Sequence, residues 1–208
     1  MTGTASTRAL LHAAFPEEVR GQPRGWEALR SWEERHGVVL PEPYRTFVAE
    51  IADGADVGPS EEDGLLTLGE TPAGWVGWKP RDWFSPEPFD GAAVRSPALP
   101  FPLKDDTQWE YDYDPRQAPL QHQAYQWGSV LLGRDEPGPE GTAAFWTLVV
   151  AGPQRGQIWT LSDAGAAPYV TNRHYVWVPG GEPVPSPPGG FLEWVKDWHT
   201  GQGWWRTD

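Results

Sequence analysis

The stretch WEALRSWEERHGVVLPEPYRTFVAEIADG, residues 26–54, predicts the centre of the fold. Its first half places Trp26, Leu29 and Trp32 at steps of three or four residues, as on a helix with one apolar side. Gly37 follows, and glycine is the usual residue at the left-handed position that ends a helix. This half therefore predicts a helix that begins at Trp26 and ends at Gly37.

The second half of the stretch predicts another helix, after a turn marked by Leu40-Pro41. Pro43 fits its first turn, where a missing N–H leaves no helical hydrogen bond unmade. The apolar residues that follow recur at positions i, i+3, i+4 and i+7, namely Tyr44, Phe47, Val48 and Ile51. Gly54 ends the pattern. Both helices need a second layer that buries their apolar sides.

The composition indicates a globular chain of 208 residues with short elements and long connections. It contains 24 Gly and 23 Pro, which interrupt helices and strands, and 14 Trp, each of which buries about 150–250 Å². The absence of cysteine excludes disulfides, thiolate metal sites and a cysteine nucleophile. This length suits one sizeable core, so we expect a single domain over residues 1–208 with its core at about 26–199.

The charge balance limits the classes of partner. Sixteen Lys and Arg against 29 Asp and Glu give a net charge of −13, which disfavours direct binding of nucleic acid or anionic membrane and favours a basic partner. No N-terminal segment has the basic start and apolar run of a signal peptide, and no window holds about 18 consecutive apolar residues. We expect a soluble, cytoplasmic protein.

The rest of the chain predicts strands and then a helix. AFWTLVV (144–150) is a continuous apolar run suited to a central strand, and the AGPQRG link after it has the Gly-Pro chemistry of a hairpin. The proline- and aromatic-rich residues 69–126 predict an ordered irregular layer. The other predicted elements are helices at 6–15 and 191–199, strands at 65–68, 127–133, 157–161 and 175–178, and a short helix or strand at 120–125. This order predicts an α+β fold with a mixed, mostly antiparallel sheet flanked by N-terminal helices and a C-terminal helix.

The sequence contains no recognisable catalytic or metal-binding motif. The five histidines have none of the spacings of zinc ligands, and no GxSxG, GxGxxG or GxxxxGK[ST] pattern occurs. His36 precedes Gly37 at a helix end, where the helix dipole favours a positive charge, so a capping or solvated role is the simpler interpretation. We expect no catalysis, no cofactor and no bound metal.

Two acidic segments supply the candidate binding residues. In KDDTQWEYDYDP (104–115), aromatic and acidic side chains alternate from Trp109 to Asp114, so an extended chain would place them on opposite sides. Three interpretations stay open: an exposed loop pinned by its aromatics, a calcium site, and a surface for the basic residues of a partner. The calcium-loop pattern D-x-D-x-D-G with a distal Glu is absent. The candidate residues are Asp105, Asp106, Trp109, Glu110, Tyr111, Asp112, Tyr113 and Asp114.

The second acidic segment is the loop that follows the two opening helices. Asp53 lies at the electronegative C-terminal end of a helix, where an acid does not stabilise the helix, and this favours a role in binding. The candidate residues are Asp53, Asp56, Glu61, Glu62 and Asp63. The two segments together could form one negative face.

An ordered set of motifs runs along the chain. The set begins with ERHG (34–37), Leu40-Pro41, YRxF (44–47), Asp53-Gly54, Gly58-Pro59 and GLLTL (64–68). It resumes at 128–133 and in LVVAGPQRGQIW (148–159), and closes with FLEW (191–194) and Trp198. This ordered set resembles the SUKH superfamily, the Smi/Knr-type family of cell-wall regulators and bacterial immunity proteins. The chain departs from the family pattern in lacking a Gly-Cys-Gly before the central strand, where residues 139–144 stand, and in its long aromatic stretch 69–126.

The resemblance implies an α+β fold with a mixed, mostly antiparallel sheet, and no catalysis. It also implies an immunity protein that binds and neutralises a cognate toxin, often a nuclease, by covering its active surface. An acidic chain suits that role, because long-range attraction to a basic surface raises the association rate. A regulatory or scaffold domain that binds an endogenous protein is the alternative, and glycan binding by Trp faces beside carboxylates is a third class.

Overall fold

A computed structural model of the chain describes residues 3–58, 64–72, 95–105, 107–108, 118–134, 144–162, 165–169 and 189–200. The helices are α1 (Gly3–Ala14), a 3-10 turn η1 (Glu17–Val19), α2 (Trp26–His36), α3 (Tyr44–Glu50), α4 (Ala118–Gln126) and α5 (Phe191–His199). The strands are β1 (Thr107–Gln108), β2 (Ser129–Arg134), β3 (Ala144–Val149), β4 (Ile158–Ser162) and β5 (Gly165–Pro168).

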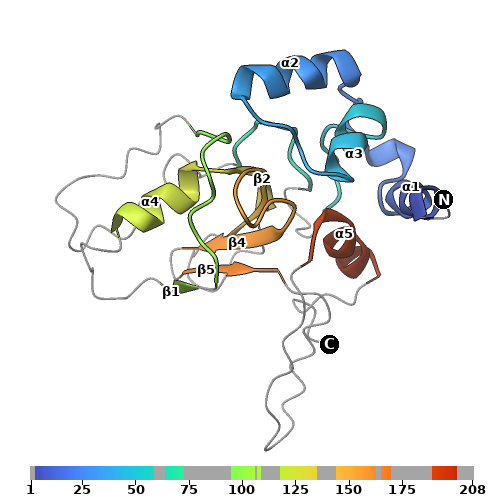
Figure 1. The fold of residues 1–208 in the computed structure, drawn as a ribbon. Helices are drawn as coiled ribbons and strands as arrows, with labels where there is room; N and C mark the ends of the chain where they lie inside the picture. Colours follow the sequence, from blue (N-terminus) through green and yellow to red (C-terminus); the bar gives the residue numbers. More distant parts are fainter. Residues whose placement is uncertain are drawn as a thin grey trace, which may run out of the picture.

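The five strands form one sheet in the order β1-β5-β4-β3-β2, and every pairing between them is antiparallel. A separate parallel bridge joins Ser96 to Trp127. Figure 1 shows α1, α3 and α5 gathered on one side of the sheet and α4 on the other. The predicted α+β class, with N-terminal helices and a C-terminal helix around a mostly antiparallel sheet, is confirmed.

One face of the sheet packs against the helices from both ends of the chain. Trp146 and Leu148 of β3 lie in this cluster together with residues of α1, α2, α3 and α5. The ring of Phe47 is 4.8 Å from that of Phe15 and 5.3 Å from that of Phe191, so aromatic contacts join α3 to both termini. The apolar stripe of α3 is therefore buried between α1, α5 and the sheet.

The opposite face of the sheet has its own hydrophobic cluster. Phe145 and Val149, which alternate with the residues above along β3, pack there with Tyr125 of α4. Phe101, from the segment before β1, contacts the ring of Trp159 at 5.1 Å. Burial on both faces explains why β3 is an apolar run in which only the buried Thr147 is polar. The single sheet thus carries one hydrophobic cluster on each of its faces.

The helix predictions agree with the structure for α2 and α5, whereas α3 ends at Glu50, before the predicted Gly54. Gly37 has φ +64° and its N–H donates to the carbonyls of the last turn of α2, as predicted for the residue that ends this helix. Pro43 stands at the N-cap of α3. The first helix begins earlier than predicted, at Gly3, and α5 has the predicted bounds. The short element at 120–125 belongs to helix α4.

The strand predictions are correct for β2, β3 and β4, and wrong for residues 65–68. Residues 65–68 form no strand: Leu65 makes one bridge to Ala55, and the Leu66 N–H donates once to Leu132 of the edge strand β2. Gly64 and Gly69 have positive φ and turn the chain away on either side of this run. Strands β1 and β5 were not predicted, and the strand expected at 175–178 lies outside the described residues.

Candidate functional site

The link between α2 and α3 is held from inside by Glu33. This carboxylate is 5% exposed and accepts hydrogen bonds from the Leu40 N–H (2.9 Å) and from Nε and Nη2 of Arg45 (both 2.8 Å). Burial alone would raise the pKa of Glu33, but the hydrogen bonds from Arg45 and Leu40 hold it below its ordinary value. Glu33 therefore stays ionised and ties α3 to the end of α2.

The turn between β3 and β4 meets the same link from the other side. Nη2 of Arg155 donates to the carbonyls of Val39 (3.0 Å) and Leu40 (3.1 Å). Gly156 has φ +95°, and a Cβ added there would lie 3.8 Å from Pro41. The Leu-Pro and Gly-Pro-Gln-Arg-Gly motifs thus contact each other, and their roles in the fold are packing and hydrogen bonding.

Asp53, a predicted binding residue, belongs to the scaffold. Its side chain is 8% exposed, accepts from Nε of Arg24 at 2.6 Å, and accepts from the Leu68 N–H at 2.8 Å. Arg24 reaches it because the Arg24 N–H donates to the carbonyl of Val48 near the end of α3. The guanidinium of Arg24 offsets the electronegative helix end beside Asp53. The inference that Asp53 serves binding was made from the helix dipole alone, without this ion pair.

Asp56, another predicted binding residue, is exposed at a small acidic surface. Its N–H donates to the carbonyl of Val19, which places it beside η1 with the exposed Glu17 and Glu18. Arg20 of the same region points inward and donates to the carbonyls at the end of α1. Three carboxylates are therefore left facing solvent here.

Asp105 is exposed at a different place, next to the β3–β4 turn. The carbonyl of its neighbour Lys104 accepts from the side chain of Gln154 at 3.2 Å, and its own carbonyl accepts from the hydroxyl of Thr107 at 3.1 Å. The other predicted binding residues lie outside the described residues: Glu61, Glu62, Asp63, Asp106, Trp109, Glu110, Tyr111, Asp112, Tyr113 and Asp114. The continuous negative face stays a prediction.

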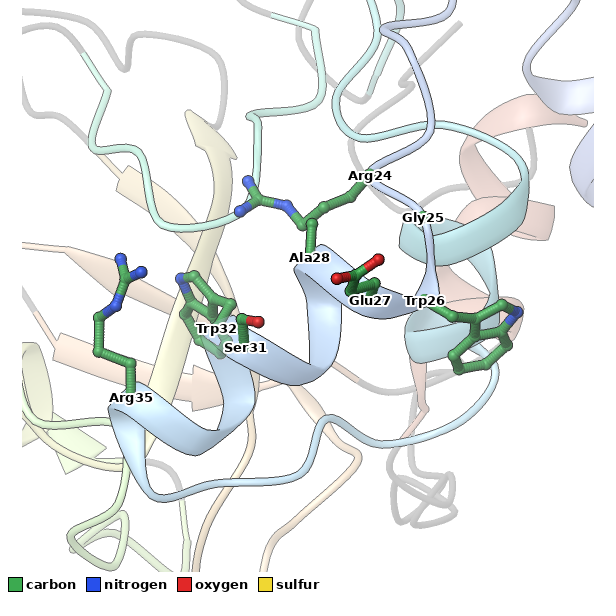
Figure 2. A pocket seen from close by; sticks show the side chains of 8 residues that line it. All are labelled: Arg24, Gly25, Trp26, Glu27, Ala28, Ser31, Trp32 and Arg35. Atoms are coloured by element: carbon green, nitrogen blue, oxygen red, sulfur yellow. The ribbon is translucent and has the colours of Figure 1, made fainter.

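An open groove of about 670 Å³ runs along one flank of α2. Figure 2 shows Arg24, Trp32 and Arg35 extending to the same side of the helix, whereas Trp26 points away. The residues that line the groove are Arg24, Gly25, Trp26, Glu27, Ala28, Ser31, Trp32 and Arg35. The sequence predicted Trp32 as a core residue. The side chain is only 7% exposed, so only a small part of it lines the groove. The groove depends on Arg24 folding back along α2, for which the sequence holds no signal.

The two arginines that line this groove differ in their hydrogen-bond partners. Arg24 is committed to Asp53 and to the carbonyl of Leu68, while Arg35 makes no hydrogen bond or ion pair within the part of the chain that the structure describes. The ring of His36 lies 4.3 Å from that of Trp32. Burial, and then the charge of Arg35, lower the pKa of His36, which opposes the preference of the helix dipole for a positive charge on this side chain.

Comparison of the chain with models of protein families, with curated proteins and with solved structures gives no match. Among the described residues, no three His, Cys, Asp or Glu side chains are grouped so that they could hold a metal ion. The helices of the described ranges are also too short or too polar to cross a bilayer.

Proposed function

We propose that this chain is a non-enzymatic protein-binding domain, an immunity-type protein that neutralises a basic toxin domain by covering its active surface. The observation that carries the proposal is the net charge of −13. Nucleases are the first class to test, because a surface that binds polyanionic nucleic acid must be basic. An acidic protein is attracted to that surface and competes for the same cationic groups.

The arrangement of the described residues is consistent with such a role. Glu17, Glu18 and Asp56 face solvent together, whereas Arg20 beside them is turned toward backbone carbonyls. The motifs that resemble the SUKH superfamily meet at the α2–α3 link and the β3–β4 turn. The resemblance thus rests on residues that build the scaffold, and specificity for one toxin has to come from exposed side chains.

The test is co-expression of the chain with each candidate toxin encoded beside its gene. We expect growth to be restored with one toxin, and the purified pair to elute as one complex in size-exclusion chromatography. A toxin of the same class from an unrelated locus is the control and should remain lethal. The proposal fails if no neighbouring gene is toxic, or if the chain neither binds the toxin nor restores growth.

A pull-down from the native cells separates this proposal from its alternative. Recovery of a toxin supports neutralisation. Recovery of an endogenous housekeeping protein in its place would contradict neutralisation and favour a regulatory or scaffold domain.

A further inference from the structure

Three chain segments that are far apart in the sequence meet at the C-terminal end of α2. A Cβ on Gly37 would lie 3.6 Å from the Cβ of Ala98, and one on Gly152 would lie 3.4 Å from Pro100. Arg155, in the same turn as Gly152, holds the carbonyl of Val39. Figure 1 shows the end of α2, the green segment around residue 100 and the orange turn before β4 on the same side of the molecule.

The exposed residues of these segments form what we call the three-turn surface. Its members are Gly37, Val39, Ala98, Leu99, Pro100, Gly152, Pro153 and Arg155. Val39 is 55% exposed and Leu99 is 41% exposed, and no other large hydrophobic side chain of the described residues is exposed. Only Arg155 of the eight residues carries a charge, in a chain of which 22% is charged. An apolar, charge-poor patch is the usual composition of the centre of a protein interface.

The three-turn surface is held in place without a partner. Arg155 donates to two carbonyls of the α2–α3 link, and the Phe101 N–H donates to the carbonyl of Ala151 at 3.0 Å. Gln154 adds a hydrogen bond to the carbonyl of Lys104. A preformed surface loses little conformational entropy on binding, which is the condition under which exposed apolar side chains contribute most to affinity.

We propose that the three-turn surface is the centre of the contact with the protein partner, with Val39 and Leu99 as its apolar anchors. This inference rests on the proposed function and adds the place of contact. The partner would present an apolar patch to these anchors and basic groups around it. Asp105, Glu34 and Glu42 are exposed next to the three segments and would meet those basic groups; they outnumber the two exposed bases beside them, Arg35 and Lys104.

Charge favours a basic partner over a second copy of this chain. Two chains of −13 repel each other, which disfavours a homodimer through this surface. A basic domain is drawn in by the same charge that keeps two copies apart. The three-turn surface therefore fits a heterologous protein.

The experiment measures the affinity of the full chain for the inactivated toxin domain with which the wild type forms a complex. Val39→Lys and Leu99→Lys place a charge where an apolar contact is expected, and each should weaken binding about 10-fold or more. Gln22→Lys adds the same charge at an exposed site in another part of the surface, and should change the affinity less than about 3-fold. Circular dichroism and the melting temperature check that all three variants fold, as expected for exposed positions.

The outcomes separate this inference from the function on which it rests. If the wild type binds a toxin and both anchor variants bind it as tightly, the three-turn surface is not the contact and only this inference falls. If the wild type binds no toxin, the proposed function fails and takes the inference with it. A wild-type dimer in light scattering that Leu99→Lys converts to a monomer would assign the surface to a second copy and would also overturn the inference.

Discussion

The link between α2 and α3 has an inner and an outer side, and adjacent residues belong to different sides. Leu40 is buried and its N–H donates to the carboxylate of Glu33. Val39 is more than half exposed, and its carbonyl accepts a hydrogen bond from Arg155. The inner side is therefore determined by the fold. The outer side has no role in the fold that would require an apolar residue, and this difference is what makes Val39 informative about binding.

The largest expected effect comes from removing the carboxylate on the inner side. Glu33→Ala leaves Arg45 and the buried Leu40 N–H without their acceptor, and should lower the free energy of unfolding by about 3 kcal/mol. Urea denaturation measures it. The control is Glu34→Ala on the exposed side of the same helix, expected within about 0.5 kcal/mol of wild type. Equal effects of the two variants would contradict the distinction between the sides.

Asp53 and Asp56 offer the same comparison in the acidic loop. Asp53→Asn removes the charge that pairs with Arg24 and weakens the acceptor for the Leu68 N–H, so we expect a loss of about 1–2 kcal/mol. Asp56→Asn, at an exposed carboxylate, should stay within about 0.5 kcal/mol. Thermal unfolding of the two variants measures the difference. An unchanged melting temperature for Asp53→Asn would contradict its role in the scaffold and make Asp53 a binding candidate again.

Arg155 tests how firmly the β3–β4 turn supports the link. Arg155→Ala removes the Nη2 group that donates to the carbonyls of Val39 and Leu40. Both carbonyls remain partly accessible to water, so a loss of about 1 kcal/mol is expected. Arg35→Ala is the matched control, because the side chain of Arg35 is exposed and makes no hydrogen bond in the described part of the chain. A loss in the control as large as in Arg155→Ala would show that charge alone, not the two bonds, accounts for the effect.

His36 should produce the smallest effect, visible as a dependence on pH. Its pKa is lowered in the folded state, so below the ordinary value of about 6.5 the unfolded chain binds more protons and the stability falls. His36→Gln should reduce the loss of stability between about pH 7 and pH 5, because glutamine takes up no proton in this range. The pKa of His12 is lowered too, by burial and by Arg20 and Arg8, so part of the loss persists in the variant. Identical pH profiles for variant and wild type would contradict the assignment.

The sequence was most informative where local pattern and packing agree. The stripe from Tyr44 to Ile51, the glycine at 37 and the apolar run of β3 each specify one element, and those elements are present. Strand β5, with the sequence GAAP, has little intrinsic preference for a strand and forms by pairing with β4. Its existence is a tertiary effect that no local pattern carries.

The candidate site was less predictable because its chemistry depends on distant pairs. Asp53 and Arg24 are 29 residues apart, and the sequence showed the acid at a helix end without its partner. The three-turn surface combines segments near residues 38, 99 and 153, and each segment alone is an ordinary turn. Exposure, unlike periodicity, is known only once the chain is folded.

The central claim is that this acidic chain acts by binding a basic protein domain. Calorimetric titration of the inactivated toxin domain into the purified chain tests it most directly, at salt concentrations from about 50 to about 500 mM. We expect saturable binding that weakens as salt screens the attraction but does not vanish, because the apolar anchors remain. Absence of binding at the lowest salt concentration, or an affinity that does not change with salt, would contradict it.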